Sequence, residues 1–388
     1  MKTKKKFGLA SLCLFLFFSP ILEGYSNTYL AIGSVWLGTA VAVIWLVETF
    51  FINSVKVNFP LICLIVLSSW MFSTALWSMD AYTSIDHGIR LMMVTILYLM
   101  VFDTVRSESN LRIAILAYTA GVTFVSISAF YNIVSGISYA NLSNRYSASG
   151  FDPNNFGLML SSAIPLVFYL VSCSGLIMRA ISIVVVLFFS LLIISSASRA
   201  ATFSLIIVLL LCLVPNRVGF RQIIGALGMC LVAFIIFLQF VDLIPDAAIA
   251  RVSQGALHDS GGGRLDAWGV ILRSFGDRPI FGHGAGTTFL VFGIQAHNTF
   301  FSTLFEGGLI ALSVWSAFIG VSIRYGIRLF MGRASYSEAV LSVSLFPLLI
   351  AVSTLNWEYR KSLFVIFAFI AVAHSLRESG SLSRRCLI

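Results

Sequence analysis

Apolar runs of about 20 residues, the length of a transmembrane helix, recur along this chain and constrain its fold more than any other feature. Hydrophobic residues make up 59% of the 388 residues and charged residues only 11%. A soluble globular domain carries about 25% charged residues, so a soluble fold is excluded. The sequence predicts an all-α polytopic membrane protein, formed as a single membrane domain over residues 1–388.

The apolar runs predict about twelve transmembrane helices. They lie near residues 7–21, 28–47, 59–78, 86–103, 112–135, 155–172, 177–195, 199–214, 222–241, 298–322, 338–354 and 362–376. The first run follows four lysines, so a cleaved secretory signal peptide is an alternative for it. The residues Gly24-Tyr25-Ser26 form a mediocre cleavage site, and we expect the first helix to be retained.

The distribution of charge predicts the orientation. With the N-terminus inside, 16 of the 25 lysines and arginines fall on the cytoplasmic side, as the positive-inside rule requires, and most acidic residues fall outside. Both termini are then cytoplasmic, and residues 242–296 form one large exported loop, periplasmic or extracellular. The net charge of +9 reports topology, so we expect no nucleic-acid partner.

The chain lacks the usual signatures of a metal or disulfide protein. It has no CxxC, HExxH or carboxylate cluster, so we expect no metal and no cofactor. Its six cysteines fall in expected spans or on the cytoplasmic side, which disfavours a disulfide framework.

Nine cations remain on the outer side, where the positive-inside rule disfavours them. Arg199 stands at the start of an expected span, where a cation opposes the helix dipole and needs an anionic partner. Arg264 opens an amphipathic stretch that we expect to lie on the membrane surface as a helix ended by Pro279. Trp268, four residues on, is placed to stack on Arg264.

His297 and Glu306 are the other candidates for chemistry. His297 lies at the outer mouth of a span, with Asn298 as its expected N-cap, and can take a proton from a hydroxyl. Glu306, a carboxylate inside the span, lies on the opposite face of a regular helix unless Gly307 and Gly308 distort it.

Two loops add weaker signals. Arg145 precedes a helix start that Asp152 can cap, and an ion pair between these two residues is the plain structural reading. Gly282 and Gly284 flank His283 in a turn that resembles a phosphate cradle. No strand precedes this turn and no clear helix follows, so it is not a dinucleotide fingerprint.

Taken together, these residues resemble the O-antigen ligase and polymerase superfamily of bacterial envelopes. The resemblance covers residues 140–310. It rests on R-x-x-x-x-G-F-x-P-N from Arg145, Ser198-Arg199, Arg264-x-x-x-Trp268, Pro279-x-x-Gly282-x-Gly284, His297-Asn298 and Glu306-x-Gly308. The histidine between the two glycines departs from the family pattern, so the resemblance assigns no role to His283.

The resemblance implies a membrane glycosyltransferase of the type C kind, metal-independent and inverting. It would move a glycan from undecaprenyl diphosphate to an acceptor hydroxyl on a glycan, on lipid A–core or on a protein, at the outer leaflet of the inner membrane. Arginines suit a diphosphate leaving group and a histidine suits deprotonation of a hydroxyl. We therefore expect Arg199, Arg264 and His297 to be catalytic. Substrate-binding residues would be Arg145, Trp268, Gly282, Gly284, Asn298 and Glu306.

Two alternatives stay open. A polymerase that joins lipid-linked repeat units shares these motifs with a ligase. A lipid-glycan flippase or transporter would place ionisable residues near the membrane midplane, whereas here they gather at the outer ends of the spans.

Overall fold

The computed structural model is a bundle of helices, and it describes residues 6–24, 29–52, 55–139, 145–172, 175–213, 264–293, 295–331 and 335–380. The described elements are α1 (Lys6–Gly24), α2 (Tyr29–Ile52), α3 (Phe59–Ser73), the 3₁₀ turn η1 (Thr74–Leu76), α4 (Ala81–Thr104), α5 (Glu108–Val134), α6 (Pro153–Val171), α7 (Leu176–Ser195), α8 (Arg199–Leu213), α11 (Arg264–Phe275), α12 (Thr287–Phe292), α13 (Thr299–Met331), α14 (Tyr336–Val343), α15 (Leu345–Thr354) and α16 (Lys361–Glu378). All of these elements are helical, as expected.

Nine helices in the described part of the chain are long and apolar enough to cross a membrane. The protein is therefore a polytopic membrane protein, as predicted. Two further expected spans fall on α8, which is shorter, and on α16, which carries charges at its ends. The expected span at 222–241 and much of the expected loop at 242–296 lie outside the described residues, so the count of twelve stays a prediction.

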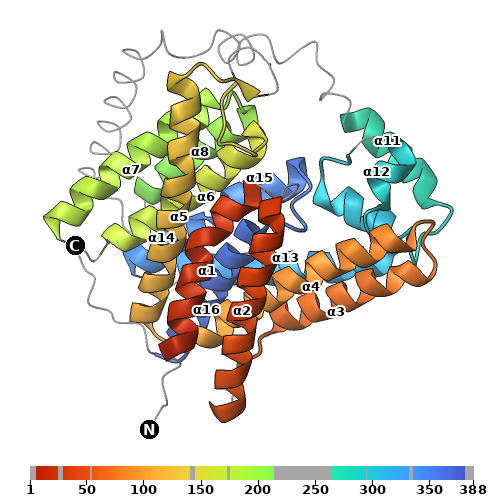
Figure 1. Cartoon of the computed structure of the whole chain (residues 1–388), viewed down its shortest axis with the longest axis horizontal. Coiled ribbons are helices and arrows are strands. Elements are labelled where there is room, and N and C mark those ends of the chain that lie inside the picture. Colours follow the sequence, from red (N-terminus) through yellow and green to blue (C-terminus); the bar gives the residue numbers. More distant parts are fainter. Residues whose placement is uncertain are drawn as a thin grey trace.

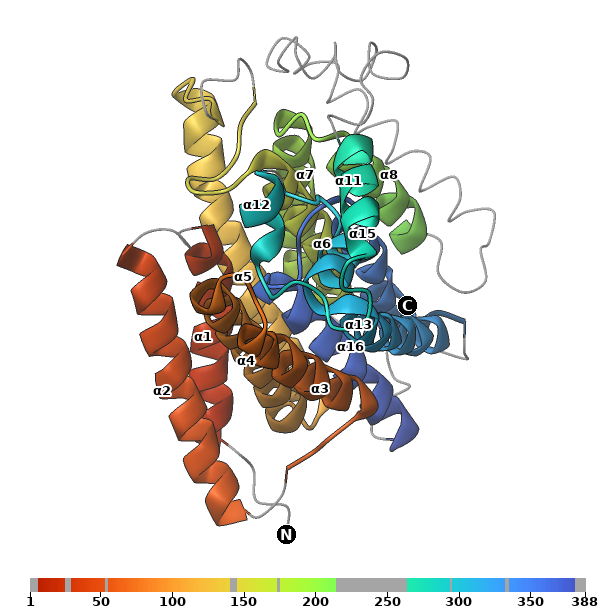
Figure 2. The same cartoon turned by 90° about the vertical axis from the view of Figure 1, so that its right-hand side faces the viewer.

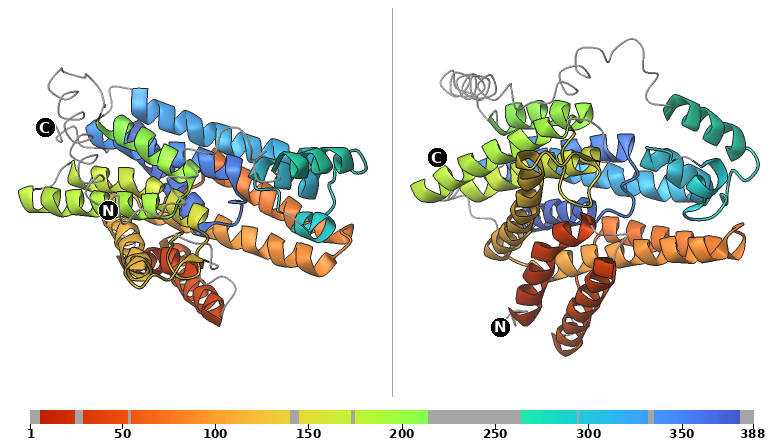
Figure 3. Two further views of the ribbon diagram at one scale, coloured as in Figure 1. Left: turned by 90° about the horizontal axis from the view of Figure 1, so that it is seen from above. Right: turned by 45° about the horizontal axis from the view of Figure 1, so that its top comes forward.

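Helix α16 forms the centre of the bundle. Every residue from 362 to 374 is buried, and the helix packs on α1, α4, α5, α13 and α14. In contrast, α2 and α7 expose much of their apolar surface, as helices facing lipid do. Helix α3 packs against both α4 and α13, and these helices run toward the end of the molecule that carries α11 and α12 (Figures 1 and 3).

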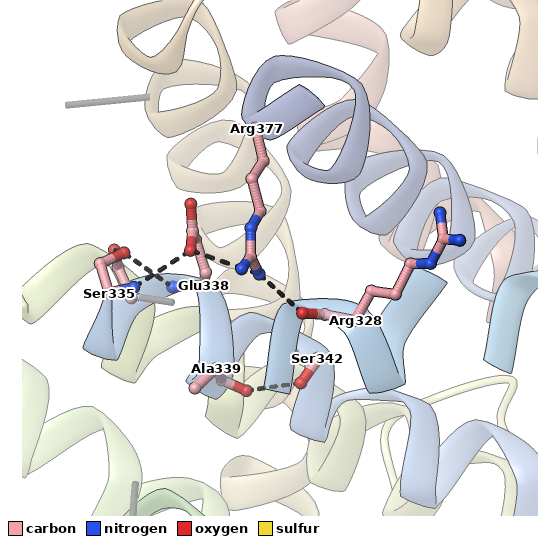
Figure 4. A network of polar contacts seen from close by, with 7 residues as sticks. Arg328, Ser335, Glu338, Ala339, Ser342 and Arg377 are labelled. Carbon is pink, nitrogen blue, oxygen red and sulfur yellow. Dashed lines mark hydrogen bonds and ion pairs between the residues drawn. The ribbon is translucent and has the colours of Figure 1, made fainter. Parts of the chain in front are cut away.

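At one end of the bundle a polar network joins α13, α14 and α16 (Figure 4). Ser335 and Glu338 form a reciprocal capping box at the start of α14. Arg377 of α16 donates to the carbonyl of Arg328 at 2.6 Å, and its guanidinium lies 3.9 Å from the Glu338 carboxylate. This cation thus holds the C-terminal ends of two helices against the start of a third.

Helix α11 ends at Phe275, four residues before the proline that we expected to end it. It lies against α13 (Figure 2), and its Ile271 is buried with Ala296 and Phe305. A short helix, α12, follows the glycine turn, so the expectation that no helix follows there is wrong. The helix is only six residues long and is flanked by Gly286 and Gly293 in left-handed conformations, which a periodicity argument does not detect.

Candidate functional site

A polar cavity of about 830 Å³ lies where seven helices meet. Its lining comes from α1, α2, α4, α6, α12, α13 and α16, and from the connections before α6, before α13 and between α15 and α16. The acidic residues that line it are Glu23, Asp86, Asp152, Glu306 and Glu358, and the basic ones are His87, Arg90, His297, Arg360 and Lys361. A volume of this size is typical of a small-molecule site.

One wall of the cavity is built around a break in α13. Gly308 has φ 69° and ψ −167°, far from helical values, so α13 is interrupted just after Glu306. The glycine turn supplies hydrogen bonds at this break: the amides of His283 and Gly284 donate to the carbonyls of Phe305 and Glu306, both at 2.9 Å. The glycine turn at Gly282–Gly286 and the Glu306-x-Gly308 motif are therefore hydrogen-bonded to each other, and we call this contact the joint.

Close approach explains the glycines of this joint. A Cβ on Gly282 would lie 2.4 Å from the carbonyl oxygen of Glu306, and one on Gly284 would lie 2.2 Å from the Ser78 hydroxyl. Both glycines also have positive φ. Gly282 packs on the backbone of α13 and Gly284 on the side chains of Ser78 and Ser84. Neither glycine lines the cavity, so direct contact with substrate stays a prediction.

The joint places the Glu306 carboxylate in the cavity wall. It accepts hydrogen bonds from the Gly286 amide at 2.7 Å and from the Thr288 hydroxyl at 2.7 Å. The Ser302 hydroxyl, one turn back on α13, lies 3.4 Å from it. Glu306 and His297 line the same cavity, although they are nine residues apart.

A second carboxyl group, Glu358, stands beside Glu306. The Ser302 hydroxyl is 3.1 Å from the Glu358 carboxyl, so this serine bridges the two acids. Burial, and then the charge of Glu306, raise the pKa of Glu358 from 4.5 to about 7. Glu358 was not among the site residues predicted from the sequence.

The segment around His297 is held from both sides. The Trp268 indole of α11 donates to the Ala296 carbonyl at 2.8 Å and stacks on Phe301 of α13. Asn298 caps α13 by accepting from the amides of Phe300 and Phe301, which confirms the expected N-cap. His297 itself has φ 47°, a left-handed conformation that non-glycine residues seldom adopt. The contacts of its two neighbours therefore stabilise this strained backbone conformation, which places the His297 side chain at the cavity.

Arg145 is brought to the turn that carries Arg199. It is 8% exposed, and it donates to the carbonyl of Ser196 and to Asn154, both at 3.3 Å. Asp152 caps α6 as expected, accepting from the amides of Asn154 and its neighbour. Asn154 and Asp152 line the cavity and Arg145 does not. Arg145 therefore contacts a lining residue, Asn154, from outside the cavity.

Arg199 and Arg264 lie at the starts of helices, as expected from the sequence. Arg199 is the first residue of α8, is exposed, and follows a tight turn in which Ala197 has φ 50°. It is not part of the cavity lining. Arg264 begins α11, and its side chain, with the expected stacking on Trp268, lies outside the described residues.

His283 has a packing environment of its own. Its ring stacks on Phe305 with centroids 4.2 Å apart, and burial lowers its pKa. It does not line the cavity.

The cations that do line the cavity were not predicted as site residues from the sequence. Arg90 pairs with Asp86 at 2.8 Å, and Arg360 lies 3.8 Å from Glu23, while Lys361 follows directly. All three cations were among the nine on the disfavoured outer side, but no spacing linked them to the motifs. Within the described residues, no group of three His, Cys, Asp or Glu is arranged to hold a metal ion.

The fold and this cavity define a multi-pass membrane protein with a polar site at the ends of its helices. Residues 183–316, about a third of the chain, match the model of a known family, described as O-antigen ligase. The resemblance expected from the motifs is thus confirmed over this region, and the match supports a membrane glycosyltransferase of the ligase or polymerase type. No curated protein matches the chain.

Proposed function

We propose that this protein transfers a glycan from undecaprenyl diphosphate to an acceptor hydroxyl, as a surface-polysaccharide ligase of the bacterial inner membrane. The family match supports the class, and one observation carries the proposal furthest. His297 is held at a polar cavity that also contains Arg90, Arg360 and Lys361. A proton acceptor and several cations at one site suit a reaction in which a hydroxyl attacks and a diphosphate leaves.

In the proposed reaction the acceptor oxygen attacks the anomeric carbon of the donor sugar. The new C–O bond forms as the bond from that carbon to the diphosphate oxygen breaks, and the diphosphate leaves with the electron pair. The hydroxyl proton passes to the imidazole of His297. Attack from the face opposite the diphosphate inverts the anomeric configuration, and no metal ion is required.

Arg199 and Arg264 remain our proposed catalytic ligands of the diphosphate, because a guanidinium binds two phosphate oxygens at once. Both begin helices of the family-matched region. The cavity cations are placed to share this task, since they line the same cavity as His297.

The remaining predicted substrate-binding residues surround the cavity. Glu306 lines it, whereas Trp268, Asn298 and Arg145 contact the segments that do. We propose that these three act on the substrate by positioning His297 and the wall around Asn154.

The proposed orientation has both termini in the cytoplasm and the cavity facing the periplasm. Every segment that lines the cavity lies at a helix end that the charge asymmetry assigns to the outer side. A membrane-impermeant thiol reagent, applied from outside, should label a cysteine placed at Ser260 but not one placed at Ser335. The reverse pattern would contradict the orientation and the function with it.

The test of the chemistry is His297→Ala in the purified full-length protein. Glycan transfer should fall by about 10²–10⁴-fold, while binding of the lipid diphosphate donor is retained. His283→Phe is the matched control, because it keeps a ring on Phe305 and lies outside the cavity lining. Near-normal transfer by His297→Ala, or a parallel loss of donor binding, would show that His297 is not the base.

A polymerase, which joins two lipid-linked repeats, is the second candidate within the same class. It is separated from a ligase by the acceptor: a polymerase accepts a second lipid-linked repeat, whereas a ligase accepts a lipid A–core or protein hydroxyl. Presenting each acceptor in turn to the same donor decides between them.

A further inference from the structure

The connection between α15 and α16 is anchored directly beside His297. The Thr299 hydroxyl donates to the Leu355 carbonyl and accepts from the Trp357 amide, both at 3.0 Å. Asn298 donates to the Ser353 carbonyl at 3.0 Å. Two residues that immediately follow His297 therefore set the position of this connection.

Trp357 anchors the same connection from the other side. Its side chain is buried, and its indole donates to the Asn155 side chain at the start of α6 at 2.7 Å. The segment is thus tied to two helices, and its backbone is held before any ligand arrives. Such preorganisation lowers the entropy lost on binding.

Three of the residues of this segment that line the cavity share one property. Asn356, Glu358 and Tyr359 each carry a buried polar atom that lacks a hydrogen-bond partner within the described structure, namely Oδ1, Oε2 and Oη. Native proteins pair nearly all buried polar atoms, so three unpaired ones within four residues require an explanation. Contact between these atoms and a ligand in the cavity requires a rotation of the side chains, which the broad terminal torsions of Asn356 and Glu358 allow.

The chemistry of these atoms selects the ligand. The Asn356 oxygen accepts, the Glu358 carboxyl accepts and, when protonated, also donates, and the Tyr359 phenol both donates and accepts. A diphosphate offers only acceptor oxygens and is repelled by a carboxylate, so it does not match them. A ligand that carries several neighbouring hydroxyl groups does match, and a sugar ring is such a ligand.

We propose that Asn356, Glu358 and Tyr359 form a sugar subsite that hydrogen-bonds the hydroxyl groups of one sugar residue beside His297. The inference deepens the proposed glycan transfer and rests on it for the statement that this sugar takes part in the reaction. The sugar belongs either to the donor or to the acceptor glycan. We assign binding of the anionic part of the donor to the cations of the same cavity, Arg90, Arg360 and Lys361.

The first experiment tests binding without any assumption about transfer. Saturation-transfer-difference NMR of the full-length protein in detergent is recorded with free hexoses and N-acetylhexosamines. Tyr359→Phe, which removes one oxygen atom, and Asn356→Ala should each weaken sugar binding about fivefold to tenfold. Tyr169→Phe is the matched control, because Tyr169 is a buried tyrosine of α6 outside the cavity lining, and it should bind as the wild type does.

The proposal is overturned if the wild type binds none of these sugars, or if the two cavity variants bind them as tightly as the control does. Thermal unfolding of each variant establishes that it is folded. Should Asn356→Ala unfold, Tyr359→Phe carries the test, since it leaves the ring contact with His87 in place.

The second experiment identifies which glycan occupies the subsite. Glycan transfer by Tyr359→Phe is compared with transfer by the wild type. An increase of about fivefold to tenfold in KM for the acceptor, with the KM for the donor unchanged, assigns the sugar to the acceptor. The same increase in the KM for the donor alone assigns the sugar to the donor. Transfer with both KM values unchanged rejects the subsite and leaves the proposed function standing. Tyr359-dependent sugar binding by a protein that transfers no glycan rejects the proposed function and leaves the subsite standing.

Discussion

Replacement of Glu358 by glutamine should change the stability of this protein in a way that depends on pH. Glu358 is buried beside Glu306, and its pKa is raised from 4.5 to about 7 by burial first and by that neighbour second. The folded protein therefore binds the Glu358 proton more tightly than the unfolded chain does. The resulting stabilisation is fully present below pH 4.5 and is lost as the pH rises through 7.

The magnitude follows from the two pKa values. One pKa unit corresponds to about 1.4 kcal/mol, so ionisation of the buried carboxyl destabilises the folded state by about 3 kcal/mol at pH 8 relative to pH 4. Glutamine has nearly the same shape and does not ionise. The free energy of unfolding of Glu358→Gln minus that of the wild type should therefore rise by about 3 kcal/mol across this range. The new amide can also change the free energy of unfolding by itself, but this contribution is the same at every pH because the amide does not ionise.

The assay is thermal unfolding of both proteins in one detergent from pH 4.5 to 8, followed by tryptophan fluorescence. Asp277→Asn is the control, because Asp277 is an exposed carboxylate in the turn after α11. The midpoint of Glu358→Gln should rise relative to the wild type as the pH increases, and that of the control should not. A difference that is the same at every pH, or a wild type that gains stability toward pH 8, would refute the reasoning.

Three further predictions concern the joint, the histidine segment and the arginines. Gly308→Ala should lower stability by about 2–3 kcal/mol, because its Cβ would lie 2.1 Å from a carbonyl oxygen, whereas Gly320→Ala, with open space, should not; thermal unfolding compares them. Trp268→Phe keeps the stacking ring but loses the hydrogen bond to Ala296, so transfer should fall about tenfold or more with donor affinity retained. Arg199→Lys and Arg264→Lys should lose transfer in the same assay although the charge remains, and full activity of both would contradict bidentate binding.

Local pattern was sufficient to predict the helices. Apolar runs of the right length fall on α1 to α8 and on α13 to α16, because a lipid-facing or buried helix must be apolar along its length. The caps at Asp152 and Asn298 were predictable for a similar reason, since a cap acts within three residues. The break at Gly308 was foreseen only as a possible distortion, because its hydrogen bonds come from a turn more than 20 residues earlier.

The site depends on contacts that no spacing rule contains. Glu358 and Tyr359 lie about 50 residues beyond Glu306 and outside the motif region 140–310, and Ser302 brings the two carboxyl groups together. One available signal was the pair Arg360 and Lys361, two cations at the outer start of a helix where topology disfavours them. It marked the segment but not its partners.

By itself the sequence determined that the chain spans a membrane many times, and it identified His297, Glu306 and the glycine motifs as one family pattern. These conclusions follow from hydropathy and from spacing, which act along the chain. The tertiary structure alone decided which residues share the cavity. It placed Arg145, Gly282 and Gly284 behind the wall, and it added Arg90, Glu358 and Arg360 to the lining. The physical reason is that a cavity between helix ends is formed by packing of segments far apart in sequence, and the polar partners of a buried charge are chosen by that packing.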